Sequence, residues 1–73
     1  MKPEDLIENR RYVATKDIHL AGESTIYGGT QLVFQQIDTP FYIFRRFDPS
    51  QDQQDQREVC LSEELVRTSI GKT

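Results

Sequence analysis

The chain has no tryptophan, and among its 73 residues there is one cysteine, Cys60, and one histidine, His19. A single cysteine excludes an intrachain disulfide framework and fits a reducing compartment. One Cys and one His also exclude a zinc site built from such ligands within one chain. The sequence holds no apolar run long enough to cross a membrane, and its polar first residues do not resemble a signal peptide. These absences predict a cytoplasmic protein.

A surplus of positive charge is also missing. Nine Lys and Arg residues face twelve Asp and Glu residues, which gives a net charge of −3. This balance argues against a general nucleic-acid binder, although it is compatible with a local basic patch. With 36% hydrophobic and 29% charged residues, the chain is globular rather than disordered. Its length predicts one domain, residues 1–73, with a core too small to enclose a large substrate cavity.

The strongest strand signal is the segment from Phe41 to Phe47, in which five of seven residues are aromatic or β-branched. Its apolar residues alternate onto both faces. We expect Phe41, Ile43 and Phe47 to face the core, together with Leu32, Phe34, Val59 and Leu61. Tyr42 and Phe44 then point the other way, and something must cover them.

Other short segments carry weaker but consistent signals. Pro3 to Arg11 suits a short N-terminal helix, because the acids come first and the arginines last. Turn residues separate further strands, and the polar stretch Asp48–Gln56 is predicted to be a mobile loop. Ser62 is a good N-cap for a helical turn, after which residues 67–73 are expected to fray. The further strands are expected at 12–15, 30–37 and 57–61.

This order of elements predicts a mainly β fold, a small antiparallel barrel of four to five strands with a short N-terminal helix (1–11) and a C-terminal helical turn. Between Tyr12 and Val66 it resembles the SH3-like small barrels of short bacterial and phage proteins. The resemblance lies in the turn spacing, the run Gly28-Gly29-Thr30 before a strand, and the closing run Val59–Val66. It implies a barrel over residues 12–66. The absence of Trp means that binding of Pro-rich peptides does not carry over.

No residue set carries a catalytic, cofactor or metal signature. Cys60 lies mid-strand and His19 in a polar turn, so a Cys–His nucleophile is not expected. Asp48, Asp52 and Asp55 lack the spacing and the glycine of a calcium loop. Gly28-Gly29-Thr30 precedes a strand, whereas a phosphate loop precedes a helix and ends in Gly-Lys-Ser/Thr. We therefore expect a protein that is not an enzyme and has no cofactor.

The remaining hypothesis is binding to another protein. The aromatic and Arg residues enriched at interface centres predict a contact surface made of Tyr27, Tyr42, Phe44, Arg45 and Arg46. An alternative is a nucleic-acid module that uses Arg45 and Arg46 between aromatics. A further alternative is a self-associating structural protein. Equally, the two ends of the chain, with Leu6, Ile7, Leu65, Val66 and Ile70, could cover Tyr42 and Phe44 and leave no such surface.

Overall fold

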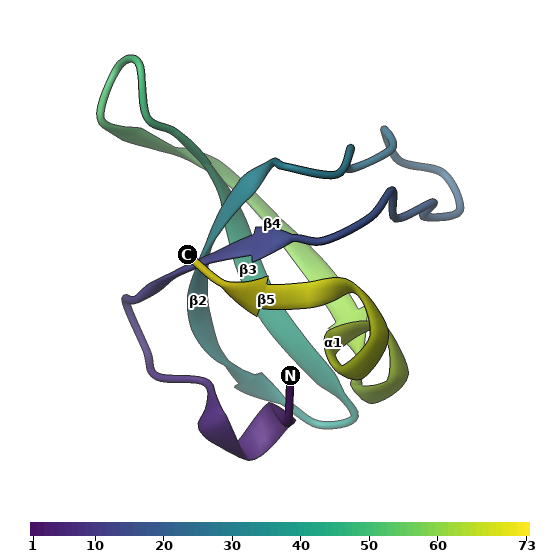
Figure 1. The fold of residues 1–73 in the computed structure, drawn as a ribbon. Coiled ribbons are helices and arrows are strands. Elements are labelled where there is room, and N and C mark those ends of the chain that lie inside the picture. The colour runs from purple at the N-terminus through teal and green to yellow at the C-terminus, as the bar shows by residue number, and fades with distance from the viewer.

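One antiparallel sheet of five strands forms most of the protein (Figure 1). The computed structural model describes residues 1–73, so no part of the chain is left out. The mainly β, antiparallel fold class predicted from the sequence is confirmed. In chain order, the elements are the 3-10 turn η1 (Pro3–Asp5), β1 (Arg11–Ala14), β2 (Gln31–Asp38), β3 (Phe41–Asp48), β4 (Gln53–Ser62), the helix α1 (Glu63–Ser69) and β5 (Ile70–Lys72).

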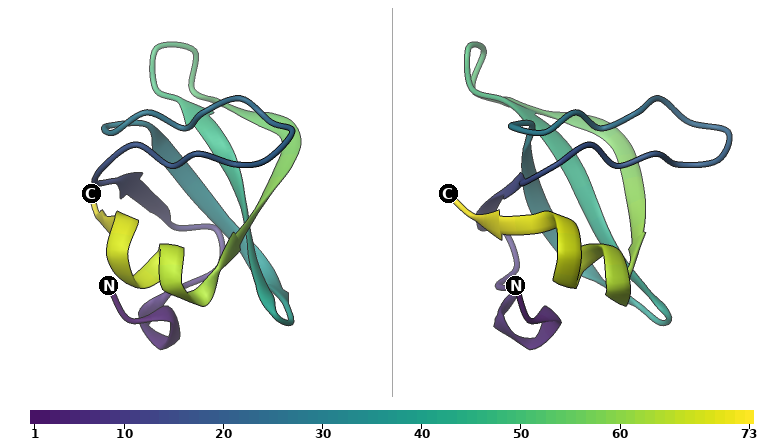
Figure 2. Two further views of the ribbon diagram at one scale, coloured as in Figure 1. Left: turned by 90° about the vertical axis from the view of Figure 1, so that its right-hand side faces the viewer. Right: turned by 45° about the vertical axis from the view of Figure 1, so that its right-hand side comes forward.

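The strand order in the sheet is β4-β3-β2-β1-β5, and every pairing is antiparallel. The sheet is open, with β4 and β5 as its two edges. The right-hand view of Figure 2 shows α1 and the edge strand β5 in front of β2, β3 and β4, and the long β1–β2 connection extending to one side. The chain therefore returns from one edge to the other through α1, and the concave side of the sheet is enclosed.

The hairpin between β3 and β4 is longer than the sequence indicated. The prediction of a mobile loop over Asp48–Gln56 is wrong in its second half, because β4 begins at Gln53 and pairs it with Asp48. The turn itself is held by Asp48, whose carboxylate accepts hydrogen bonds from the Ser50 amide at 3.0 Å and hydroxyl at 2.6 Å. Polar residues form a strand here because ladder hydrogen bonds to β3 need no apolar side chains.

The predicted N-terminal helix is reduced to the single turn η1. The backbone beyond it makes a turn at Glu8 and Asn9, where Asn9 has a φ of 68°, and then pairs with β2 rather than within a helix. The Asn9 amide donates to the Phe34 carbonyl at 2.8 Å, and the Phe34 amide donates to the Arg10 carbonyl at 3.1 Å. A helix of under three turns has little stability of its own, so these sheet hydrogen bonds decide the conformation.

The C-terminal segment is more ordered than the sequence predicted, whereas the N-terminal segment has less helix. Ser62 caps α1 as predicted, since its hydroxyl accepts from the Leu65 amide at 3.3 Å. The tail does not fray, however. Ile70 is buried at 2% exposure, and β5 pairs with β1 with Gly71 opposite Val13. The sequence signal that could have indicated this strand is the apolar Ile70 followed by the small Gly71.

The core lies on the concave side of the sheet. Leu32, Phe34, Val59 and Leu61 are buried as expected, and Ile18 and Ile26 join them from the β1–β2 connection, where they form an isolated β-bridge. The buried cluster as a whole contains Tyr12, Ala14, Ile18, Ile26, Leu32, Phe34, Phe44, Val59, Leu61, Val66 and Ile70.

The two faces of β3 are reversed relative to the sequence prediction. Phe44 is fully buried and packs on Phe34 with ring centroids 5.3 Å apart, whereas Phe41 is 44% exposed and Phe47 is only partly buried. Ile43 is buried, but it lies outside the central cluster. The reason is the register. Phe44 is opposite both Phe34 and Val59, and opposed residues of an antiparallel pair share a face.

The ends of the chain cover the inner face of β3. Val66 and Ile70 belong to the core cluster, and Leu6 and Leu65 pack against it from the outside, as does half-buried Tyr42. The amino group of Met1 donates to the Arg67 and Ile70 carbonyls, which ties the first residue to the end of α1. The alternative in which the termini cover Tyr42 and Phe44 therefore holds for Phe44, whereas Tyr42 stays partly exposed and Ile7 is 50% exposed.

Candidate protein-interaction surfaces

The five predicted contact residues do not form one surface. Phe44 is fully buried, so it contacts no partner in this fold and is removed from the candidate site. Tyr42 lies on the same inner face but near the end of the sheet, and it keeps partial exposure. Tyr27 is 66% exposed in the β1–β2 connection. Arg45 lies on the outer face of β3, opposite to Tyr42.

The two adjacent arginines have separate structural roles. The guanidinium of Arg46 donates to the Ser24 carbonyl at 2.9 Å, which fastens the β1–β2 connection to β3. The guanidinium of Arg45 lies 3.8 Å from the Glu58 carboxylate on the neighbouring strand, and both side chains are partly exposed. A solvent-accessible pair at this distance contributes little stability. Nε of Arg45 is buried without a hydrogen-bond partner.

A shallow groove lies where the β2–β3 hairpin meets the start of α1. Its volume is about 300 Å³, and Ile37, Thr39, Pro40, Tyr42 and Glu63 line it. Ile37 is 59% exposed and lies opposite Tyr42 in the ladder, so the two apolar side chains share one wall. We call this the hairpin groove.

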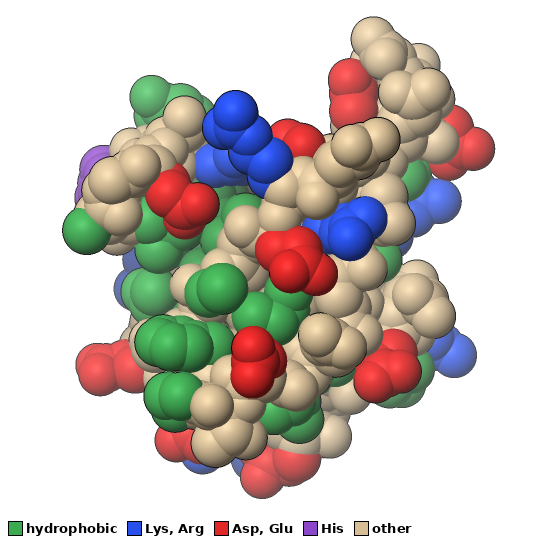
Figure 3. All heavy atoms as spheres, turned by 180° about the vertical axis from the view of Figure 1, so that it is seen from behind, with side chains coloured by type: hydrophobic (Ala, Val, Ile, Leu, Met, Phe, Trp, Pro, Cys, Tyr) green, Lys and Arg blue, Asp and Glu red, His purple; other side chains and the backbone are tan.

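Apolar residues at this end of the sheet are exposed on the other side of the hairpin as well. Phe41 lies on the outer face beside the groove, and its side chain is 44% exposed. The other large apolar side chains exposed on the surface are Tyr27, Ile37 and Ile7. The view from behind in Figure 3 shows apolar side chains gathered in the lower left of the molecule, with charged side chains around them. An apolar gathering of this kind is typical of an interaction site.

The outer face of the sheet carries a second arrangement of basic and aromatic groups. The Arg11 guanidinium carbon lies 4.2 Å from the centre of the Phe47 ring, a cation–π contact. Val33 lies between Arg11 and Arg45 in adjacent strands of the same row. The sequence prediction named Arg45 here but missed Arg11, because only the register brings these strands together.

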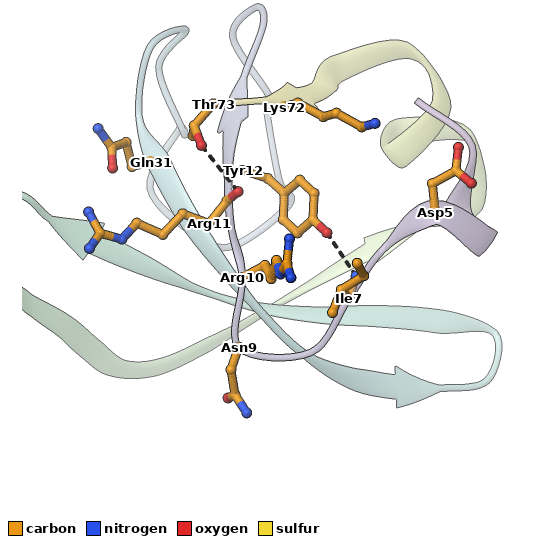
Figure 4. A pocket seen from close by; sticks show the side chains of 9 residues that line it. All are labelled: Asp5, Ile7, Asn9, Arg10, Arg11, Tyr12, Gln31, Lys72 and Thr73. Carbon is orange, nitrogen blue, oxygen red and sulfur yellow. Dashed lines mark hydrogen bonds between the residues drawn. The ribbon is translucent and has the colours of Figure 1, made fainter.

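A third feature is a hollow beside β1 and β5, which Figure 4 shows from close by. Its volume is about 660 Å³, and its charged lining side chains are Arg10, Arg11, Lys72 and Asp5. Tyr12 closes it on the core side with only 4% exposure, and its hydroxyl oxygen accepts a hydrogen bond from the Ile7 amide at 2.8 Å. We call this the basic hollow.

The only histidine and the only cysteine of the chain lie apart from the surface hollows. The His19 ring is hydrogen-bonded to the Thr25 hydroxyl at 3.2 Å, and Cys60 is exposed on β4; none of the surface hollows is lined by either residue. No group of three or more His, Cys, Asp and Glu side chains is placed to hold a metal ion. In the β3–β4 turn, the Ser50 hydroxyl and then the Ser50 amide lower the pKa of Asp48, an ordinary effect of hydrogen bonds to a carboxylate.

Neither helix has the length and apolarity needed to span a bilayer. Comparisons with models of protein families, with curated proteins and with solved structures found no match for this chain.

Proposed function

We propose that the protein is a small non-enzymatic module that binds another protein, as an accessory, regulatory or inhibitory subunit. The hairpin groove carries this proposal. It presents an exposed Ile37 beside the ring of Tyr42, which is the kind of aromatic and aliphatic anchor found at the centres of interfaces. Tyr42 is also the one aromatic residue among the predicted contact residues that lines a hollow.

The chemistry of the groove defines what a partner should present. Ile37 and Pro40 supply an apolar wall, and no hydrogen bond within the protein involves the Tyr42 hydroxyl. Glu63 lies at the rim, where its only ion pair is with Arg67 at 3.6 Å between two exposed side chains. The groove therefore suits an apolar side chain flanked by a basic group, with Glu63 as the counter-charge.

The SH3-like arrangement is part of the same proposal. Its support is that β1 lies between β2 and β5, and that a single short helix joins β4 to β5. A fold of this size leaves no enclosed space for a substrate. Such a scaffold suits binding through surface hairpins better than chemistry in a cavity.

The test is affinity capture from the native host with the full chain and two matched variants. Ile37→Ser removes a 59% exposed apolar side chain from the groove, and Tyr27→Ser removes a 66% exposed one from the β1–β2 connection. We expect Ile37→Ser to abolish capture of a specific protein and Tyr27→Ser to leave it unchanged. Both variants should unfold like the parent. Equal capture by all three chains would refute the proposal, and capture of only the protein itself would identify self-association.

A second candidate function is nucleic-acid binding by the outer face, because the Arg11–Phe47 contact and Arg45 lie on it together. It predicts salt-dependent binding of oligonucleotides that weakens in Arg11→Gln and Arg45→Gln. Arg46→Gln is the control, because Arg46 lies on the other face. Two observations weigh against it. Arg11 already covers the Phe47 ring, and the chain is net acidic.

A further inference from the structure

The basic hollow gathers positive charge that the rest of the protein lacks. It holds three of the nine Lys and Arg residues but only one of the twelve Asp and Glu residues, so the remaining chain carries six cations against eleven anions. The two ion pairs of the protein are Arg45–Glu58 and Arg67–Glu63. None of Arg10, Arg11 and Lys72 forms an ion pair with an Asp or Glu side chain. The Arg11 guanidinium instead lies over the Phe47 ring, which leaves Arg10 and Lys72 as the unpaired cations of the hollow.

The strand register places two of these cations on the same side of the sheet. Lys72 lies opposite Tyr12 in the β1–β5 ladder, so the two side chains share a face. Arg10 precedes Tyr12 by two residues, and its carbonyl accepts from the Phe34 amide, which continues the β1–β2 pairing by one residue and places Arg10 on that face as well. Figure 4 shows Arg10 close to the Tyr12 ring, whereas the Arg11 side chain runs away from it. Arg10 and Lys72 therefore lie on the same face as Tyr12, on either side of it. The Arg11 guanidinium lies on the outer face, over the Phe47 ring.

The Tyr12 hydroxyl adds an uncharged hydrogen-bond donor between Arg10 and Lys72. Its oxygen accepts from the Ile7 amide, and its own proton has no acceptor among the protein's hydrogen bonds. Because the side chain is 96% buried, its ring is fixed and the hydroxyl is held in place. Two exposed cations beside one fixed hydroxyl form a site for an oxygen anion.

We propose that the basic hollow binds carboxylate side chains of an acidic segment of the partner protein. This inference rests on the proposed binding function and names the partner's chemistry at a second contact. The charge distribution favours a short acidic segment over a nucleic acid. A polyanion that ran beyond the hollow would meet a surface with an excess of acids, whereas a short segment ends within the basic region.

The experiment is a titration of the isotope-labelled full chain, followed by NMR, with a short peptide of consecutive glutamates flanked by Ser and Gly. A peptide with glutamine in place of glutamate is the matched control. We expect amide shifts concentrated at residues 10–12 and 71–73 with the acidic peptide alone. Affinity should fall as salt is raised, because the contacts are ionic.

Variants of the lining residues make the test specific. Arg10→Gln and Lys72→Gln should each weaken binding about tenfold, as expected for loss of a hydrogen bond to a charged group, and the double variant should not bind. Tyr12→Phe should weaken binding about threefold. Lys16→Gln makes the same change of charge outside the hollow and should alter affinity less than about twofold. Unfolding curves of all variants check that each variant retains the fold.

Three results would overturn the inference. The shifts could fall outside the hollow, Lys16→Gln could weaken binding as much as Arg10→Gln, or an oligothymidylate could bind more tightly than the peptide through the same residues. None of these decides the proposed function, which is tested by the dependence of capture on Ile37. Capture that needs Ile37 but is unaffected in the Arg10→Gln/Lys72→Gln variant would leave the module function standing without an acidic segment.

Discussion

Phe41 and Phe44 are three residues apart in β3 and have opposite environments. Phe44 is fully buried against Phe34, and Phe41 is 44% exposed at the end of the sheet. The same residue type in the same strand therefore serves the core in one place and the surface in the other. The comparison shows that the apolar residues of β3 have two roles. Those on the inner face stabilise the core, and Phe41 leaves an apolar surface beside the hairpin groove.

Replacement of the two phenylalanines gives the largest expected contrast. Phe44→Ala should lower the free energy of unfolding by about 3–5 kcal/mol, because it leaves a cavity in the core. That is a large part of the stability expected for a domain of this size. Phe41→Ala should cost less than about 1 kcal/mol. Urea unfolding of both variants measures the contrast, and equal losses would show that Phe41 belongs to the core.

A smaller effect is expected where β5 closes the inner face. A Cβ atom at Gly71 would lie 2.8 Å from Cγ2 of Thr15, so Gly71→Ala forces a displacement. We expect a loss of about 1–3 kcal/mol, typical of overpacking. Thr15→Ser removes the obstructing methyl group and should restore most of this loss in the double variant. Without that recovery, the cost of Gly71→Ala would have another origin than this contact.

A third prediction concerns the N-cap of α1, the helix that joins β4 to β5. Ser62→Ala removes the acceptor for the Leu65 amide and should cost about 1 kcal/mol. Ser62→Asp keeps an acceptor at this position and should retain the stability. Thermal unfolding followed by circular dichroism distinguishes the two variants. A Ser62→Ala variant as stable as the parent would mean that packing alone holds the helix.

The smallest effect concerns the β3–β4 turn, far from both phenylalanines. Because hydrogen bonds from Ser50 lower the pKa of Asp48 below the ordinary aspartate value of 3.8, the ionised carboxylate stabilises the fold above that pH. This contribution is lost as the pH falls through the lower, folded-state pKa. NMR titration of the Asp48 carboxyl carbon should give a midpoint below 3.8, and Ser50→Ala should raise it. A midpoint unchanged by Ser50→Ala would contradict the assigned cause.

The fold class followed from short-range features that need no knowledge of the register. Alternating apolar residues, the turn at Asp38–Pro40 and the N-cap Ser62 act within a few residues of themselves, so the strands β2 and β3 and the helix α1 were predictable. The tail was not, because Ile70–Lys72 becomes a strand only through pairing with β1. The polar start of β4 likewise depends on its partner β3.

The candidate sites were less predictable than the fold. Tyr42 was predicted to be a contact residue and lines the hairpin groove, but Phe44 was assigned to the wrong face and Ile37 was assigned only to a strand. Arg10 and Lys72 are 62 positions apart in the sequence, and only the β1–β5 ladder brings them to either side of Tyr12. No local signal identifies such a pair, because charged side chains are common at both ends of a chain.

By itself, the sequence determined that this is a small, acidic, mainly β protein whose aromatic strand has apolar residues on both faces. Tertiary structure decided which face became the core. Along one strand, alternation distinguishes two sets of side chains but does not say which set is inside, since both are apolar in β3. Pairing of Phe44 with Phe34 and Val59 settled that choice, and the two chain ends then enclosed it.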